Sequence, residues 1–199
     1  MKVITVTDGE FGENCYIVNH DGFLYVIDPG IDFEAVKRTI TQEALPVKAV
    51  FLTHGHYDHV FSIAGFNNST VYAHAAEQAL LEDPAINLSA YTGTPLCVKP
   101  VNYYRGENFT MDGFEFIHTP GHTAGCVVIK NGDILFSGDT LFYDTVGRTD
   151  LPTGDSKVLQ KSLKKFDAFD KNLMVYPGHG EAFILGDAYK RNFFLKKNA

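Results

Sequence analysis

The chain has 199 residues, of which 45% are hydrophobic and 21% charged, a composition typical of a globular protein with a substantial core. A net charge of −7 without a long basic run disfavours binding to the nucleic-acid backbone. A membrane-spanning helix needs about 20 consecutive apolar residues, and no apolar run in the sequence approaches that length. Asp8 and Glu10 interrupt the N-terminus where a signal peptide would be apolar. We therefore expect a cytoplasmic protein without nucleic-acid or membrane partners.

The first half of the chain predicts short strands joined by turns. Two short β-patterns flank Asp21-Gly22, a dipeptide typical of a β-hairpin. Apolar residues at Phe33, Val36 and Ile40 have nearly helical spacing. The expected elements are strands over 2–7, 15–19, 23–28 and 47–52, helices over 33–40 and 75–81, and a long irregular loop over 83–106.

The second half continues in the same style without repeating the sequence. Strands are expected over 114–118, 126–130, 134–137 and 173–176, and helices over 158–166 and 188–195. Two sets of strands with interspersed and terminal helices indicate a layered α/β fold, formed as a single domain over 1–199. Cys15, Cys97 and Cys126 are scattered and lack metal or redox spacing, so we expect three buried apolar side chains.

A dense group of metal-binding side chains follows the predicted strand 47–52. The stretch HGHYDH holds His54, His56, Asp58 and His59 within six residues. On an extended segment, the spacing of two turns His54 and His56 to the same side. Asp58 and His59 fall at the start of an expected helix and approach from another direction. One tetrahedral ion takes about four ligands, so these four donors with others from elsewhere could hold two ions.

Three further donors occur where later strands end. His122 lies in TPGHT, Asp139 in SGDTLF and His179 in PGHG. Loops at strand ends commonly carry the functional side chains of a rigid scaffold. Asp139 alone could be a turn or capping residue, and a lone histidine is more often a surface or hydrogen-bonded residue. We apply that second interpretation to the remaining histidines: His20, His74 and His118.

The order and separation of HGHYDH, TPGHT, SGDTLF and PGHG resemble those of the metallo-β-lactamase superfamily, from VIDPG at 26–30 to PGHG at 177–180. The resemblance implies an αββα sandwich of two mixed sheets flanked by helices, with the metal site along one edge. It also implies two divalent metal ions, zinc being expected and iron or manganese being alternatives. Residue by residue, it implies a first metal held by His54, His56 and His122, a second held by Asp58, His59 and His179, and Asp139 as the bridge.

The same resemblance implies roles for two further residues beside the metal ligands. Asp28, in VIDPG, matches an acidic position that supports the site by orienting a ligand ring; a turn-starting role before Pro29-Gly30 is the equally weighted alternative. Arg148 falls where glyoxalase II-type thioesterases place a basic residue that touches the thiol carrier of the substrate. A plain surface arginine is the competing interpretation.

The stretch SGDTLFYDTVGRTD and the ending RNFFL look most like short bacterial glyoxalase II-type enzymes, although Phe193 replaces a proline of that ending. The longer enzymes of this type append a helical glutathione-binding region, which we do not expect here. Their aromatic residue shortly after the last metal histidine is also missing, because Gly180-Glu181-Ala182 stand there. Both departures put glutathione in doubt as the carrier thiol.

The implied function is hydrolysis of a small thioester, S-lactoylglutathione or a related acyl-thiol, by a metal-bound hydroxide between the two ions. A thiolate leaves readily, so no separate general acid is required; Asp58 could shuttle a proton besides being a ligand. An alternative is a mononuclear-iron persulfide dioxygenase using His54, His122 and Asp139. Hydrolysis of another ester or amide, and metal binding without catalysis, are the further alternatives.

Overall fold

The computed structural model describes residues 1–7, 12–30, 32–99 and 101–196, and these residues form two compact units. The first unit comprises residues 1–73 and 78–104, and the second comprises 74–77 and 105–199. Asp8 and Glu10, which led us to expect no signal peptide, lie outside the described residues. Across the described ranges, no helix has the length and apolar character to cross a membrane.

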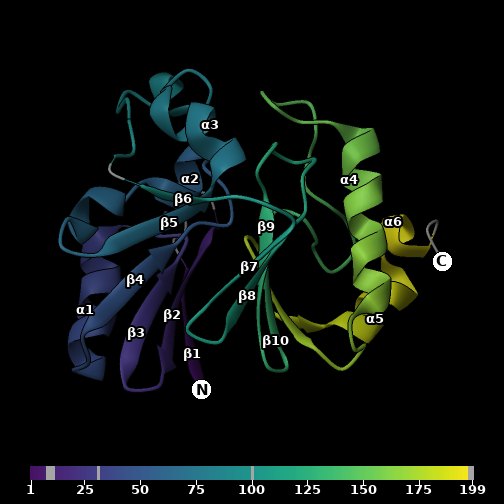
Figure 1. Ribbon diagram of the computed structural model, residues 1–199, viewed down its shortest axis with the longest axis horizontal. Helices are drawn as coiled ribbons and strands as arrows, with labels where there is room; N and C mark the ends of the chain where they lie inside the picture. Colours follow the sequence, from purple (N-terminus) through teal and green to yellow (C-terminus); the bar gives the residue numbers. More distant parts are fainter. Residues whose placement is uncertain (8–11, 31, 100, 197–199) are drawn as a thin grey trace. The chain divides into compact units, whose positions relative to one another are not determined.

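The first unit contains a mixed six-stranded sheet whose strands follow chain order (Figure 1). Its first three strands are antiparallel, and the next two join in parallel. The predicted hairpin at Asp21-Gly22 is confirmed, with φ of 49° and 80° at the two turn residues. The strands are β1 (Lys2–Thr7), β2 (Asn14–His20), β3 (Phe23–Ile27), β4 (Val47–Phe51), β5 (Thr70–His74) and β6 (Asn102–Tyr104).

Helix α1 (Phe33–Glu43) covers one face of this sheet. Asp32 caps its first turn by accepting a hydrogen bond from Glu34 N, and the chain leaves it through Ala44 in the left-handed conformation. Val36 on its inner side is fully buried in a cluster with the strand residues Val26 and Val50. This apolar burial holds the frame from which the segment after β4 emerges.

The connections of the first unit are more ordered than the sequence predicts. The expected helix 75–81 is divided: Gln78–Glu82 forms α3 in this unit, whereas Ala75–Glu77, which belongs to the second unit, forms a 3₁₀ turn. The expectation of an irregular loop over 83–106 is wrong in two places, because this range contains the 3₁₀ turn Ser89–Tyr91 and strand β6. A strand of three residues is too short to reveal its period in the sequence. Short helical segments at Tyr57–Val60 (α2) and Ile63–Phe66 complete the unit.

The second unit contains another mixed six-stranded sheet, in the order β12-β11-β10-β9-β8-β7. All neighbours are antiparallel except the parallel pair β10 and β11. The strands are β7 (Asn108–Met111), β8 (Phe114–His118), β9 (Val127–Asn131), β10 (Ile134–Gly138), β11 (Met174–Pro177) and β12 (Phe183–Ile184). The two edge strands, β7 and β12, are absent from the sequence prediction because each is short.

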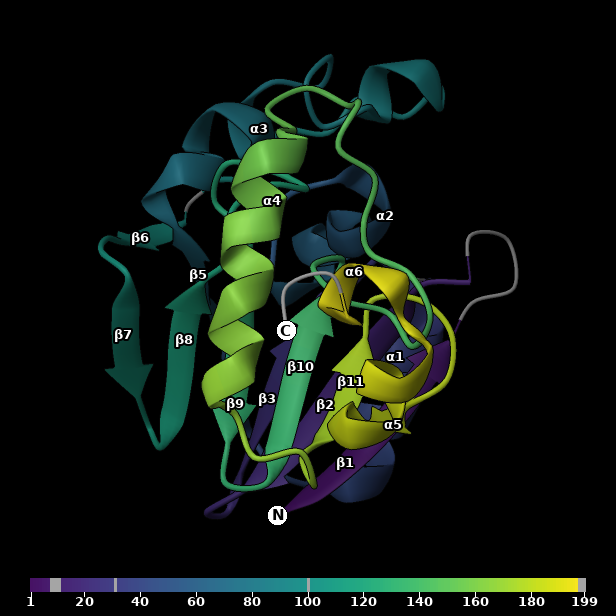
Figure 2. The same ribbon diagram turned by 90° about the vertical axis from the view of Figure 1, so that its right-hand side faces the viewer.

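The helices of the second unit pack on one face of its sheet (Figure 2). They are α4 (Ser156–Leu163), which a 3₁₀ turn at Lys164–Ala168 extends, α5 (Leu185–Arg191) and α6 (Phe193–Lys196). Leu159, Leu163 and Leu195 share a buried cluster with the strand residues Leu135 and Val175. The prediction of one continuous helix over 188–195 is wrong, because Asn192 takes an extended conformation (φ −71°, ψ 114°) between α5 and α6.

Candidate metal centre

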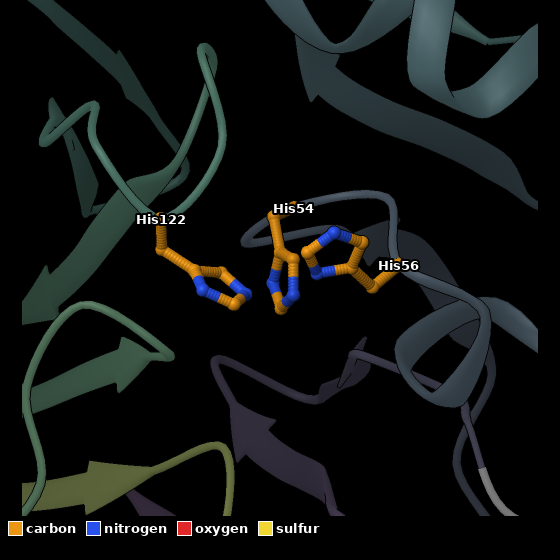
Figure 3. A group of neighbouring side chains, drawn as sticks. All are labelled: His54, His56 and His122. Carbon is orange, nitrogen blue, oxygen red and sulfur yellow. The ribbon is translucent and has the colours of Figure 1, made fainter. Parts of the chain in front are cut away.

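The first set of predicted ligands lies directly after strand β4. His54 and His56 stand on this segment with their rings perpendicular and their centroids 4.9 Å apart (Figure 3). The short helix α2 carries Asp58 and His59, and the ring of His59 lies 4.1 Å from that of His54. All three histidine side chains are buried. Since polar rings are rarely crowded into a core without a ligand or strong hydrogen bonds, three buried histidines at this density indicate a binding site.

A network of hydrogen bonds determines which ring nitrogen of His54 and of His59 carries the hydrogen. The Thr53 hydroxyl donates its one hydrogen to Asp28 Oδ2 at 2.6 Å. In its contact with His54 Nδ1 at 3.1 Å, the hydroxyl oxygen must therefore be the acceptor and the ring nitrogen the donor. His59 Nδ1 likewise donates to Asp28 Oδ2 at 3.1 Å. In the neutral rings of both histidines, the lone pair is therefore on Nε2.

Asp28 thus serves as an acceptor of hydrogen bonds in this network. Its Oδ1 also accepts a bond from the backbone nitrogen of Thr53 at 2.7 Å. The turn role weighed in the sequence is present as well, since Gly30 N donates to Asp28 O and Asp28 has a positive φ of 48°. Gly30 is needed at this place, because a Cβ there would lie 1.4 Å from the carbonyl oxygen of Asp58.

The second set of predicted ligands follows three strand ends of the second unit. His122 comes from the loop after β8 (Figure 3), Asp139 directly follows β10, and His179 follows β11. Asp139 Oδ2 lies 3.6 Å from His122 Nε2 and 3.7 Å from His179 Nε2. These separations exceed a hydrogen bond. Two ligand atoms on one tetrahedral ion lie about 3.4 Å apart when the metal–ligand bonds are about 2.0–2.2 Å long. The two distances from Asp139 Oδ2 are close to that value.

The backbone of residues 147–148 supports His122. Its Nδ1 donates to the carbonyl oxygen of Arg148 at 2.7 Å, which leaves the lone pair on Nε2, the atom facing Asp139. Gly147 packs so tightly here that a Cβ would lie 2.0 Å from Asp139 O and 2.9 Å from His122 Nδ1. The segment that leaves Asp139 therefore returns to lock the ring of His122.

The two sets suit a divalent metal by the chemistry of their donors. His54, His59 and His122 are each held with Nδ1 donating and Nε2 available as a ligand atom. A second interaction that orients a ligating histidine in this way is the usual arrangement around protein-bound metals. Imidazole and carboxylate together suit zinc, iron and manganese, so the donor set alone does not select among these metals.

Arg148 contributes through its backbone, and its side chain points to another partner. The guanidinium donates to both carboxylate oxygens of Asp150 at 2.7 Å, and both side chains are largely exposed. This pairing lowers the pKa of Asp150 to about 2 and raises the pKa of Arg148. The anion-anchor role of Arg148 remains a prediction, and a substrate anion would have to compete with Asp150 for the guanidinium.

Two supporting residues were missed by sequence reasoning. Thr53, which directly precedes HGHYDH, connects Asp28 to His54 through its hydroxyl group, and its place beside the motif was the available signal. Glu77 is buried and its Oε1 accepts hydrogen bonds from Thr123 Oγ1 and Gly125 N, both at 2.6 Å. These bonds shape the turn after His122, and no sequence pattern pointed to Glu77.

The remaining histidines and the cysteines take other roles. His74 accepts a hydrogen bond from Ala76 N and His118 forms one with Ala124 O, so the hydrogen-bonded role expected for both is confirmed; in addition, their rings stack with centroids 4.0 Å apart. Burial, together with Glu13 and Asp28, raises the pKa of Cys15, and burial with Glu77 raises that of Cys126. Both thiols are therefore neutral and unsuited to nucleophilic attack. Cys97 is exposed, which corrects the expectation that it is buried.

Comparison with known protein sequences places the chain in a family. The model described as "Metallo-beta-lactamase superfamily" matches residues 8–179. A probable metallo-hydrolase of Streptococcus pyogenes is 33% identical over 98% of this chain and 90% of its own length. Hydroxyacylglutathione hydrolase GloC of Haemophilus influenzae is 28% identical over 100% of this chain and 99% of its own.

Solved structures give the same answer. A protein called TTHA1623, in a di-iron-bound form, matches with a TM-score of 0.89 and 36% identity over 97% of this chain and 100% of its own. BLEG-1, described as a B3 metallo-β-lactamase, matches with a TM-score of 0.88 and 35% identity over 98% and 99%. On this evidence the chain belongs to the metallo-β-lactamase superfamily and has its fold, two mixed sheets flanked by helices.

Proposed function

We propose that this metal-dependent hydrolase of the superfamily cleaves a small thioester, S-lactoylglutathione or a related acyl-thiol. The observation that carries the proposal is a full-length likeness to GloC, whose name states hydrolysis of a hydroxyacylglutathione, together with groups of histidine and aspartate side chains that could hold a metal ion. The stretch SGDTLFYDTVGRTD supports the same class by its resemblance to glyoxalase II-type enzymes. The protein is proposed to act as one domain over 1–199.

In this proposal, the two sets of ligands are halves of one dinuclear centre. His54, His56 and His122 would hold the first divalent ion. Asp58, His59 and His179 would hold the second. Asp139 would bridge the two, and its position close to both His122 and His179 supports that role. When bound, the two ions supply an activated water and polarise the carbonyl of the substrate.

The side chains of this chain would orient and balance that chemistry. Asp28 and Thr53 hold His54 and His59 in the tautomer that can ligate, and the Arg148 carbonyl does the same for His122. Asp58 is the least buried carboxylate of the set, and its Oδ2 lies 3.9 Å from His59 Nε2. It is proposed to take up the proton that the attacking water loses. The thiolate can leave without a general acid, because the pKa of its conjugate thiol is low, about 8.5 for cysteine.

The test is a metal assay combined with a substrate panel. The purified protein is analysed for zinc, iron and manganese, and then assayed with S-lactoylglutathione, an acyl-coenzyme A, an acyl-cysteamine and a cephalosporin. The proposal expects about two metal ions per chain, thioesters as the best substrates, and activity that is lost on chelation and restored by metal. A preference for the cephalosporin would replace the proposal with β-lactam hydrolysis, which the likeness to BLEG-1 favours as the second candidate.

The same preparation tests the oxidative alternative. One iron per chain, together with oxygen uptake and sulfite formation from glutathione persulfide, would overturn the hydrolase proposal. A matched pair of variants tests the site itself. His56→Ala should lower turnover by at least about 100-fold while the circular dichroism spectrum stays unchanged. His20→Ala, at a histidine on β2 outside both ligand sets, should leave turnover at the wild-type level.

A further inference from the structure

Asn192 is a fully buried polar side chain at the junction of α5 and α6. Its side-chain nitrogen donates one hydrogen to the carbonyl oxygen of Phe142 at 3.1 Å and the other to that of Thr145 at 2.8 Å. Its side-chain oxygen accepts a hydrogen bond from the backbone nitrogen of Phe194 at 2.9 Å. The amide thus links the C-terminal helices to a loop that lies 47 to 50 residues earlier in the chain.

That loop is part of the 139–148 segment, which has the proposed ligand Asp139 at one end and a residue that supports the proposed ligand His122 at the other. It begins at Asp139 and ends at Arg148, whose carbonyl oxygen accepts the hydrogen bond from His122 Nδ1. In its middle, Phe142 N donates to Thr145 O at 3.0 Å. Asn192 therefore binds both ends of the turn from Phe142 to Thr145, and this turn sets the path of the 139–148 segment.

A displacement of the 139–148 segment would reach the ligands directly. Gly147 leaves no spare space between Asp139 O and the ring of His122. On the other side, a partly open pocket of about 220 Å³ lies beside the segment, lined by residues that include Val146, Leu159 and Phe194. Among the residues that the structure describes, no side chain packs against the segment across this pocket, so hydrogen bonds have a larger share in fixing it.

We propose that Asn192 is a positioning residue for the metal centre. It holds the 139–148 segment so that the Arg148 carbonyl selects the Nδ1–H tautomer of His122 and Asp139 stays in place beside that ring. This inference rests on the proposed function, since it concerns the same ligands. Asn192 itself touches neither His122 nor Asp139 through any bond described above, and it acts through the backbone.

A capping role alone is the competing explanation, and one substitution separates the two. Asn192→Asp keeps an oxygen that can accept the bond from Phe194 N and so cap α6. It replaces the side-chain nitrogen with an oxygen that faces the carbonyl oxygens of Phe142 and Thr145, so both donations are lost and replaced by repulsion. A pure cap tolerates this change, whereas a positioning residue does not.

The experiment measures the ring of His122 and the metal affinity separately. Long-range ¹H–¹⁵N NMR of the metal-free protein should give a single Nδ1–H tautomer for His122 in the wild type and a mixture of both tautomers in Asn192→Asp. Metal affinity, from competition with a chromophoric chelator, should fall by about 10-fold, the lower end for loss of support around a ligand. Asn68→Asp, the same change at an exposed asparagine, should alter neither value.

Asn192→Ser is the second variant, because its smaller polar side chain avoids the repulsion if Asn192→Asp does not fold. It should show the same mixed tautomers of His122, since a serine hydroxyl cannot donate to two carbonyl groups. A lowered melting temperature with the wild-type tautomer and metal affinity would overturn the inference. A wild-type protein that binds no metal would overturn the proposed function instead, and the tautomer measurement would still decide the role of Asn192.

Discussion

The side-chain oxygen Oδ2 of Asp28 accepts a hydrogen bond from Nδ1 of His59, 31 residues later in the chain, at a distance of 3.1 Å. The same oxygen accepts the hydroxyl hydrogen of Thr53. One carboxylate therefore decides which nitrogen of two different histidines carries the proton. Because an imidazole binds a metal only through an unprotonated nitrogen, this carboxylate holds both proposed ligands in the tautomer that a metal would need.

Replacing Asp28 should weaken metal binding while the fold persists. In Asp28→Asn, one oxygen becomes an NH₂ group, so the side chain loses acceptor capacity toward Thr53 and His59. We expect metal affinity to fall about 10–100-fold, measured by chelator competition. Asp21→Asn, at a side chain that is 85% exposed, is the control and should bind metal like the wild type. Equal affinities for both variants would show that Asp28 has no part in the site.

The Thr53 hydroxyl gives a finer test of the same network. Thr53→Val keeps the shape of the buried side chain and removes the link between Asp28 and His54. Loss of a buried hydrogen bond should lower the free energy of unfolding by about 1–3 kcal/mol, measured by urea denaturation, and His54 should show both tautomers by NMR. Thr53→Ser retains the hydroxyl and should keep the wild-type tautomer. A single tautomer in Thr53→Val would contradict the assignment.

Gly147 should not tolerate a side chain. In Gly147→Ala, the new Cβ meets Asp139 O at 2.0 Å and the His122 ring at 2.9 Å, so the backbone or the ring must move. Overpacking of this kind costs about 1–3 kcal/mol of stability, and turnover should fall with it. Gly186→Ala, whose nearest contact would be Lys171 O at 3.0 Å, is the milder control in the same unit. Thermal melts and thioesterase assays of both variants decide the matter.

His74, whose ring stacks on that of His118, should make the free energy of unfolding fall at acid pH. Burial, then the neighbouring His118, lowers the pKa of His74 below its ordinary value of 6.5, although the Gly106 backbone and Glu107 oppose this. The folded state thus binds its proton less readily than the unfolded state. The stability that neutral His74 contributes to the folded state is complete above about pH 6.5. This contribution is lost as the pH falls through the pKa of His74 in the folded state.

His74→Phe removes this titration and keeps an aromatic ring against His118. Urea denaturation of the metal-free protein at pH 7.5 and pH 5.0 should therefore give a smaller difference for the variant than for the wild type. His20→Phe serves as the control, because His20 lies partly exposed on β2. The same pH dependence in His74→Phe and in the wild type would remove His74 as a source of acid sensitivity.

Much of the fold was predictable from local patterns. The hairpin around Asp21-Gly22, helix α1 and the strands β4, β8 and β10 follow from periodicity and turn residues, which act over a few residues. The failures are short edge strands and the C-terminal helix. Asn192 interrupts that helix because its side chain bonds to Phe142 and Thr145, and a contact at such separation leaves no periodic signal.

The candidate ligands themselves were also predictable, because histidine and aspartate cluster at strand ends in a spacing that is rare by chance. What the sequence by itself determined is this inventory of donors and the family that their order implies. The tertiary structure decided which nitrogen of His54, His59 and His122 can ligate. It also decided that Arg148 supports His122 through its carbonyl oxygen and that the Arg148 guanidinium binds Asp150. The physical reason is that tautomers depend on hydrogen-bond partners 26 and 31 residues away, which only folding brings within 3.1 Å.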